Sequence, residues 1–228
     1  GGWTCHYVVA LMRRLTGECR RGHTGPLDPA ATGLLVLCLG RATLFVEYMI
    51  RHDKRYEGII RLGTSTTTDD AEGETLETGV PPFLTEQVLT TVAAQFTGRI
   101  RQRPPAFSAL KVQGKRAHVL ARAGEVVELA EREVNVHRLH LSVKSSETLS
   151  ASVHCGSGTY IRSLARDIGS ALGCPAHLSS LRRTTVAQFA VEAAWTLTQL
   201  EQFASDGLIT EALLPPDDGL LGWPAAIL

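Results

Sequence analysis

The residue best placed for chemistry in this chain is Asp28, which lies in the glycine- and proline-rich segment GHTGPLDPAATG of residues 22–33. Pro26 and Pro29 fix their own φ angles and push the residues before them, Gly25 and Asp28, towards extended conformations. A carboxylate held in such a rigid turn could act as a nucleophile or as a general base. Asp-Pro turns without a function are common, so the segment alone leaves a purely structural turn as an equal alternative.

Three further blocks of polar, aromatic and glycine residues follow in order along the chain. They are DKRY, RLG and TDDAEG at residues 53–56, 61–63 and 68–73; PAFSALK and GK at 105–111 and 114–115; and GTYIR and LRR at 158–162 and 181–183. With residues 22–33 they make the chain resemble the TruB family of tRNA pseudouridine synthases over about residues 1–190. Ordered blocks are far more specific than one short motif.

The resemblance implies a group of catalytic residues. Asp28 matches the family's catalytic aspartate, which attacks ribose C1′ or takes a proton from C2′. Tyr56 matches the aromatic residue that stacks on the target base and helps to deprotonate C5. Arg162 matches the arginine that pairs with the catalytic aspartate, and Asp70 matches a second aspartate of that arginine network. This chemistry implies neither a metal nor a cofactor.

The resemblance also implies residues that bind RNA. His23 matches an RNA-contacting histidine, although a histidine at this position would by itself be read as structural or solvent-facing. Leu181 matches an apolar residue beside the target nucleotide. The candidates for phosphate contacts are Lys54, Arg55, Lys111, Lys115, Arg182 and Arg183. The implied partner is tRNA, bound through its T-arm stem-loop.

The charge distribution supports a nucleic-acid partner although the net charge is zero. Residues 99–122 contain seven Lys or Arg and no acidic residue, whereas residues 184–228 contain six acidic residues and no Lys or Arg. This asymmetry predicts a basic face for a polyanion and an acidic tail elsewhere in the molecule. A solvated charged helix remains an alternative for the basic run.

The cysteines, at positions 5, 19, 38, 155 and 174, show no CxxC spacing, so we expect neither a disulfide framework nor a zinc ribbon. Cys38 and Cys155 are predicted to be buried as small apolar residues. No apolar run reaches the ~18 residues that a membrane span needs, and residues 1–20 lack the pattern of a signal peptide. We therefore expect a soluble protein of the cytoplasm, or of an organelle if a transit peptide has been removed.

The hydrophobic pattern predicts the elements that would position these residues. Helices are expected at residues 6–15, 42–50, 85–96, 117–123, 159–172 and 198–203. Strands are expected at 34–39, 56–62, 134–143, 149–155 and 186–191, with 134–143 and 149–155 as an antiparallel pair. Because strands and helices mix without strict βαβ alternation, the predicted fold class is α+β, with a mixed, largely antiparallel sheet flanked by helices.

The resemblance predicts a catalytic domain over residues 1–192 and a short acidic helix and tail over residues 193–228, too short for the RNA-binding PUA module of many family members. Family members usually begin with an apolar strand that ends in Lys-Pro. This strand is absent before Gly1, so we expect an N-terminally clipped domain. A monomer is the default expectation for the oligomeric state.

The function that the resemblance implies is the isomerisation of uridine 55 in the T-arm loop of tRNA, by base flipping, C1′–N1 cleavage and C1′–C5 reattachment. One alternative is an RNA-binding or tRNA-folding protein whose catalysis is dispensable or lost. Another is a glycoside hydrolase that uses Asp28 with Asp69 or Asp70 as a carboxylate pair. Arg162 argues against the hydrolase, because it would hold Asp28 ionised.

Overall fold

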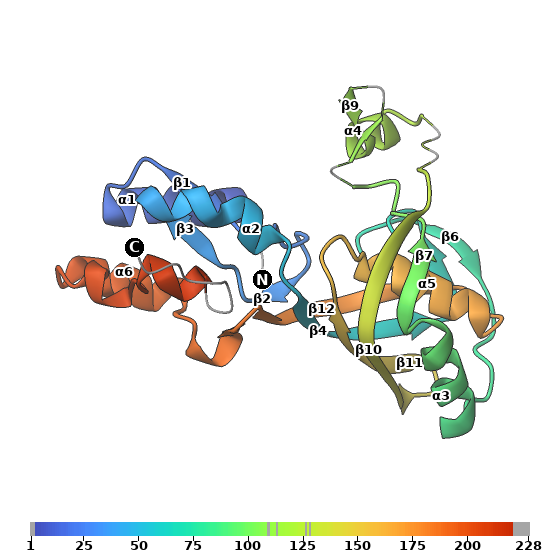
Figure 1. Cartoon of the computed structure of the whole chain (residues 1–228). Coiled ribbons are helices and arrows are strands. Elements are labelled where there is room, and N and C mark those ends of the chain that lie inside the picture. The colour runs from blue at the N-terminus through green and yellow to red at the C-terminus, as the bar shows by residue number, and fades with distance from the viewer. Residues whose placement is uncertain (1–2, 109, 113, 126, 128, 221–228) are drawn as a thin grey trace. The chain divides into compact units, whose positions relative to one another are not determined.

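The computed structural model describes residues 3–108, 110–112, 114–125, 127 and 129–220 (Figure 1). The chain divides into two compact units. Unit 1 comprises Gly1–Lys54 and Arg182–Leu228, and unit 2 comprises Arg55–Leu181. Strands β4 (Lys54–Leu62) and β12 (Ala176–Val186) therefore each have residues in both units.

A mixed, largely antiparallel sheet runs through unit 2 in the strand order β12-β4-β11-β10-β7. The other strands of this seven-stranded sheet are β7 (Gly98–Gln102), β10 (Arg132–Ser145) and β11 (Thr148–Cys155), together with β2 (Thr32–Gly33) and β13 (Phe189–Ala190), which both pair with β12. β10 pairs antiparallel with both β7 and β11. The remaining elements of unit 2 are the hairpin strands β5 (Thr64–Thr66) and β6 (Thr75–Thr78), the hairpin strands β8 (Lys111–Val112) and β9 (Lys115–Arg116), and the helices α3 (Glu86–Gln95), α4 (Ala117–Arg122) and α5 (Ile161–Ala171).

Helices α3 and α5 pack on the sheet and share one apolar core with it (Figure 1). In β11, the alternate residues Leu149, Ala151 and Val153 are buried, as expected for a strand with one face on the core. From α5, Leu164 and Ile168 are almost fully buried in the same core. The backbone of α5 is thereby fixed, and with it the polar side chains that this helix carries.

Helix α5 makes a close approach to the chain at Gly169. A Cβ built at this position would overlap the Cβ of Ala176 and would lie 2.7 Å from the carbonyl oxygen of Cys174. Glycine in a helix interior costs roughly 0.5–1 kcal/mol relative to alanine. Gly169 therefore reduces the intrinsic stability of α5 but permits it to lie directly against the start of β12.

Unit 1 is built from both ends of the chain. Its elements are α1 (Cys5–Thr16), β1 (Arg21–His23), β2 (Thr32–Gly33), β3 (Leu37–Leu39), the 3-10 helix η1 (Gly40–Phe45), α2 (Val46–Ile50), β13 (Phe189–Ala190), η2 (Val191–Ala193), α6 (Leu197–Ser205), η3 (Ile209–Ala212) and η4 (Pro216–Leu220). β1 pairs antiparallel with β3, while the end of β12 pairs parallel with β2 and antiparallel with β13. Both longer helices begin at a threonine cap: the hydroxyl of Thr4 accepts the amide of Tyr7 before α1, and Thr196 forms a capping box with Gln199 before α6.

The predicted α+β class is confirmed, as are the helices predicted at residues 6–15, 85–96, 117–123, 159–172 and 198–203 and the strands predicted at 56–62, 134–143 and 149–155. The helix predicted at 42–50 is instead η1 followed by α2, and the strand predicted at 34–39 is reduced to β3. The strand predicted at 186–191 is interrupted: β12 ends at Val186, the chain turns at Ala187, whose φ is 51°, and only Phe189–Ala190 continues as β13.

Two predictions from composition can also be compared with the structure. Cys38 and Cys155 are buried, as predicted. None of the described helices is long and apolar enough to cross a membrane.

Candidate active site

Asp28 lies half-buried in unit 1, on the aspartate loop (residues 24–31) between β1 and β2. The loop is anchored at its start, because the buried Thr24 donates its amide to the carbonyl of Val36 at 3.1 Å. The amide of Ala31 donates to the Asp28 carbonyl at 2.9 Å and closes a turn just after the carboxylate. Gly25 has a φ of 124°, which only glycine adopts readily. The backbone that carries Asp28 is therefore fixed on both sides.

Arg183 connects the beginning of the aspartate loop to the chain beyond its end. Its Nη1 and Nη2 donate to the carbonyls of Pro26 at 3.2 Å and Gly25 at 3.1 Å, and its Nε donates to the carbonyl of Leu34 at 2.8 Å. The residue is only 1% exposed. The phosphate contact predicted for Arg183 is therefore replaced by an internal role, because its guanidinium is buried and already donates to backbone carbonyls.

The backbone of Arg183 holds the end of the loop as well. β2 pairs in parallel with β12, with Gly33 opposite Arg183, and the Leu34 amide donates to the Arg183 carbonyl at 2.8 Å. A Cβ at Gly33 would overlap that carbonyl oxygen, and the φ of Gly33 is 100°. Only glycine fits this position.

Lys54 is also an internal residue rather than an exposed cation. Its Nζ donates to the carbonyls of His52 at 2.8 Å and Ile50 at 3.0 Å, and the residue is 8% exposed. Its Cε lies within 3.6 Å of the position that a Cβ on Gly25 would take. Lys54 therefore packs against the start of the aspartate loop, and its burial argues against the phosphate contact predicted for it.

His23 is half-buried directly before the aspartate loop. Its Nδ1 accepts the amide of Gly25 at 3.3 Å, so that nitrogen carries no proton in this arrangement. Burial lowers the pKa of His23, and the charge of Arg183 lowers it further, against an opposing backbone hydrogen bond. The ring is therefore neutral at pH 7, with Nε2–H as its donor.

In unit 2, Arg162 on α5 forms a buried ion pair with Asp70 on the acidic loop (residues 67–73). Arg162 Nη1 lies 3.2 Å from Asp70 Oδ2 and also donates to the carbonyl of Thr68 at 3.1 Å. Asp70 Oδ1 accepts the hydroxyl of Thr68 at 2.5 Å and the amide of Glu72 at 3.0 Å. The structure thus joins two of the residues predicted for the arginine network in one charge-assisted pair.

Tyr56 and Leu181 both pack at the margin of the unit 2 core. Tyr56 lies on β4 two residues before Gly58, so the two share one face of the sheet. A Cβ at Gly58 would lie 3.5 Å from Leu181 Cδ1 and 3.2 Å from Leu178 Cδ1. The aromatic ring and the apolar side chain predicted to contact the nucleotide therefore belong to the same face.

The other candidates for phosphate contacts differ in how far they are described. Arg55, Lys115 and Arg182 are exposed, as a phosphate contact requires. The backbone of Lys111 lies in β8, and its side chain lies outside the described part of the chain.

Sequence reasoning missed Arg166, one helical turn after Arg162 on α5. Its Nη1 lies 2.6 Å from Asp69 Oδ2, and its Nε lies 2.9 Å from Asp167 Oδ1. Asp69 was considered only as a glycosidase carboxylate. The available signal was the i, i+4 spacing of the two arginines, which places them on one helix face opposite two consecutive aspartates.

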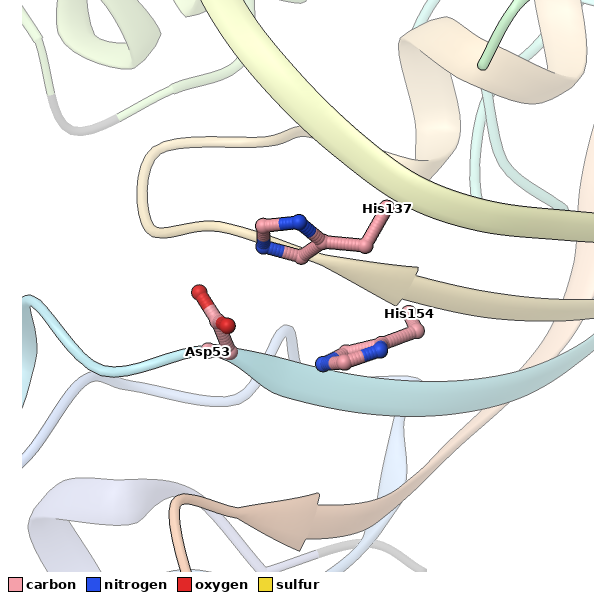
Figure 2. Close-up of side chains that lie close together, drawn as sticks. All are labelled: Asp53, His137 and His154. Carbon is pink, nitrogen blue, oxygen red and sulfur yellow. The ribbon is translucent and has the colours of Figure 1, made fainter. Parts of the chain in front are cut away.

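A pair of histidines in unit 2 offers nitrogen atoms that could bind a metal ion. His137 on β10 and His154 on β11 have ring centroids 4.8 Å apart and planes tilted by 47° (Figure 2). Asp53, also drawn there, belongs to unit 1. Imidazole nitrogens are common metal ligands, but a closed site needs more than two of them.

Comparison with known proteins places the chain among the pseudouridylate synthases. Residues 13–161 match the model described as TruB family pseudouridylate synthase (N terminal domain), and residues 162–220 match tRNA pseudouridylate synthase B C-terminal domain. The tRNA pseudouridine synthase B of Xylella fastidiosa is 46% identical over 225 residues, covering 98% of this chain and 74% of that protein. The protein of the same name from Thermobifida fusca is 51% identical over 207 residues, covering 87% of this chain and 71% of that protein. The chain belongs to the TruB family.

Solved structures agree on the fold. A Cbf5-Nop10-Gar1 complex contains a chain that matches with a TM-score of 0.71 and 27% identity over 96% of this chain. An H/ACA RNP bound to a substrate RNA containing 2′-deoxyuridine matches with a TM-score of 0.70 and 26% identity, also over 96% of this chain. This chain spans 58% and 57% of the lengths of those two solved chains.

Proposed function

We propose that this chain converts uridine 55 in the T-arm loop of tRNA to pseudouridine. The observation that carries this proposal is the match to the TruB family over residues 13–161 and 162–220, which include every catalytic candidate. The relatives named tRNA pseudouridine synthase B support tRNA as the substrate. The proposed reaction rearranges one nucleotide and consumes no second substrate.

Asp28 performs the central step of the proposed reaction. It either attacks C1′ as the C1′–N1 bond breaks and is displaced when C5 attacks C1′, or it takes the C2′ proton during cleavage and returns it afterwards. In both routes the uracil rotates, the C1′–C5 bond forms, C5 loses a proton and N1 gains one. A carboxylate on a clamped backbone suits this role, because a reacting group must be held close to its target atom.

Tyr56 and Leu181 receive the flipped base in this proposal. An aromatic face contributes ~1–3 kcal/mol of stacking per base, which offsets much of the cost of unstacking the nucleotide. Tyr56 also helps to remove the proton from C5, and Leu181 supplies apolar contact beside the nucleotide.

Arg162 and Asp70 form the arginine network of the site. A guanidinium near a catalytic carboxylate favours the ionised form, which is the form that both proposed routes require. Asp70 holds the Arg162 guanidinium in one orientation, and their 3.2 Å ion pair supports this assignment.

RNA is bound by His23 and by exposed cations in the proposed complex. The neutral His23 donates a hydrogen bond through Nε2, while Arg55, Lys111, Lys115 and Arg182 contact phosphates. We assign Lys54 and Arg183 to the support of the aspartate loop, because both are buried.

We further propose that residues 1–192 form the catalytic domain and residues 193–228 an accessory acidic helix and tail. The protein acts as a monomer on the T-arm stem-loop. Its place is the cytoplasm of a bacterium, as its bacterial relatives suggest, or an organelle.

The test of this function is pseudouridine detection on unmodified tRNA, by carbodiimide adduct formation and primer extension. Wild-type protein and Asp28→Asn are compared, with Glu147→Gln as the matched acid-to-amide control. Glu147 pairs with Arg61 at 3.1 Å on the surface, and both side chains are about half exposed. We expect a stop at uridine 55 with the wild type and the control and none with Asp28→Asn.

Two other results would contradict the proposal in different ways. RNA binding without any stop would favour an RNA-binding or tRNA-folding protein. A stop that persists in Asp28→Asn would show that another residue carries the chemistry.

A further inference from the structure

Arg166 is the arginine on α5 to which the proposed reaction assigns no role. Besides its ion pairs with Asp69 at 2.6 Å and Asp167 at 2.9 Å, its Nη2 donates to the carbonyl of Arg103 at 2.9 Å. Its side chain is 28% exposed, and that of Asp69 is 13% exposed. Arg166 therefore ties the acidic loop and the proline segment (residues 103–107) to α5.

Arg162 makes the same pair of connections one helical turn earlier. Its Nη1 contacts Asp70 and the Thr68 carbonyl, and its Nη2 donates to the carbonyl of Phe107 at 3.2 Å. Residues four apart lie on one face of a helix, so the two guanidiniums meet the two segments side by side. Both arginines therefore contact the acidic loop, and both contact the proline segment.

The acidic loop adopts an uncommon backbone conformation at Asp69. Its φ is 59°, a left-handed value that residues other than glycine rarely adopt and that Asp and Asn tolerate best. The Leu178 amide donates to the Asp69 carbonyl at 3.0 Å, which fixes the loop against β12. Burial raises the pKa of the Asp69 carboxyl, and Arg166 opposes that shift. Without Arg166, a buried carboxylate would have to leave its position or take up a proton.

We propose that Arg166 and Asp69 are positioning residues for the Asp70–Arg162 pair, holding the acidic loop so that Asp70 meets Arg162 in one geometry. The inference rests on the proposed pseudouridine-forming function, because it assigns the Asp70–Arg162 pair to that reaction. Because Asp69 and Asp70 are consecutive in the chain, a shift of the backbone at Asp69 also displaces Asp70.

The test uses Asp69→Asn and Arg166→Lys in the full chain, with kcat and KM measured on a T-arm stem-loop. Asn accepts the positive φ and has the same shape as Asp, so Asp69→Asn removes the charge and replaces one carboxylate oxygen by an NH2 group without changing the size of the side chain. Lys keeps the charge but cannot reproduce the planar fork of Arg. We expect kcat to fall about 10-fold to 100-fold in each variant, while KM changes by less than about threefold. The double variant should lose little more than the worse single variant.

A direct RNA contact by Arg166 predicts a different result. If Arg166 bound RNA directly, Asp69→Asn would remove a negative charge near the RNA and would tighten RNA binding without changing kcat. Arg166→Lys would then raise KM. Either finding would overturn the proposal. So would a kcat per folded molecule equal to that of the wild type in both variants, since a purely structural pair would lower only the melting temperature.

Controls separate this proposal from the proposed function. Wild type and Asp28→Asn run in the same assay: if the wild type forms no pseudouridine, the function itself fails. Glu147→Gln, which breaks an exposed ion pair of the same unit, should retain wild-type kcat and KM. Thermal melting identifies the folded fraction at the assay temperature, and the isosteric Asp69→Asn decides the matter if Arg166→Lys folds poorly.

Discussion

At the scale of single residues, neighbouring arginines on β12 have opposite environments. Arg182 is exposed, whereas Arg183 is buried and donates to the carbonyls of Gly25, Pro26 and Leu34. Alternation along a strand produces this contrast, because successive side chains point to opposite faces. Two residues of one type in one motif therefore support different parts of the proposed function.

Arg183→Lys should destabilise the protein by about 1–3 kcal/mol, because buried carbonyls lose donors that a single ammonium cannot replace. Urea denaturation measures this change. The matched control is Arg182→Lys at the exposed neighbouring position, which should stay within about 0.5 kcal/mol of the wild type. Equal effects of the two substitutions would refute the internal role of Arg183.

His23 should titrate below its usual pKa of about 6.5, because burial of the ring and the nearby charge of Arg183 both lower its pKa. The depressed pKa means that the unfolded chain binds the proton more readily. The stability that neutral His23 contributes is therefore fully present above about pH 6.5 and is lost as the pH falls through the lower folded value. Titration of the imidazole signals by NMR checks the shift, and a midpoint at or above the unfolded value would contradict it.

The residue types of the site could be read from the sequence, but their environments could not. Asp28, Tyr56, Asp70 and Arg162 were singled out from the motifs, and the structure pairs Arg162 with Asp70. Whether a cation in a basic motif is buried depends on segments far away in the chain. Arg183 and Gly25 are separated by 158 positions, and no local pattern encodes their contact.

At the scale of elements, α5 and β12 show where local patterns succeed and fail. The apolar spacing and flanking glycine of α5 predicted that helix correctly. β12 was missed because its middle carries Ser179, Ser180 and the two arginines, so it lacks the apolar alternation of a typical strand. β12 is held in an extended conformation instead by the strands that pair with it, which are β4, β2 and β13.

Gly169→Ala should destabilise the protein by about 1–3 kcal/mol, although alanine is the better helix former. The added Cβ would overlap Ala176 and crowd the Cys174 carbonyl, so α5 would have to move away from β12. Thermal or urea denaturation provides the measurement. Ser170→Ala, at the next and exposed position of the same helix, is the control and should be neutral or slightly stabilising.

At the scale of the whole molecule, zero net charge conceals a separation of charge along the chain. Basic residues concentrate at 99–122, and residues 184–228 are acidic without a single Lys or Arg. Such an arrangement can attract RNA to one surface while the total charge stays balanced. Net charge alone is therefore a poor guide to the partner of this protein.

Affinity for the T-arm stem-loop should fall steeply as the salt concentration rises, because phosphate contacts release counterions. Lys115→Ala and Arg182→Ala should each reduce the slope of log affinity against log salt by about 1. Filter binding or fluorescence anisotropy over a salt series measures the slope. Arg14→Ala, which removes an exposed cation paired with Glu201, is the control and should leave it unchanged. A salt-independent affinity would remove the support for a phosphate-binding face.

The hydrogen bonds from Arg183 to the aspartate loop also determine when, during synthesis, the protein can acquire its proposed catalytic geometry. Gly25 leaves the ribosome 158 residues before Arg183. At roughly 5–20 residues per second, this delay is on the order of 10 to 30 s. Unit 2 is complete within that interval, since all its residues precede Arg182. A nascent chain interrupted before Arg183 would thus carry the loop residues and the whole of unit 2 but could not hold the aspartate loop, so the proposed catalytic geometry forms only after Arg183 has been made.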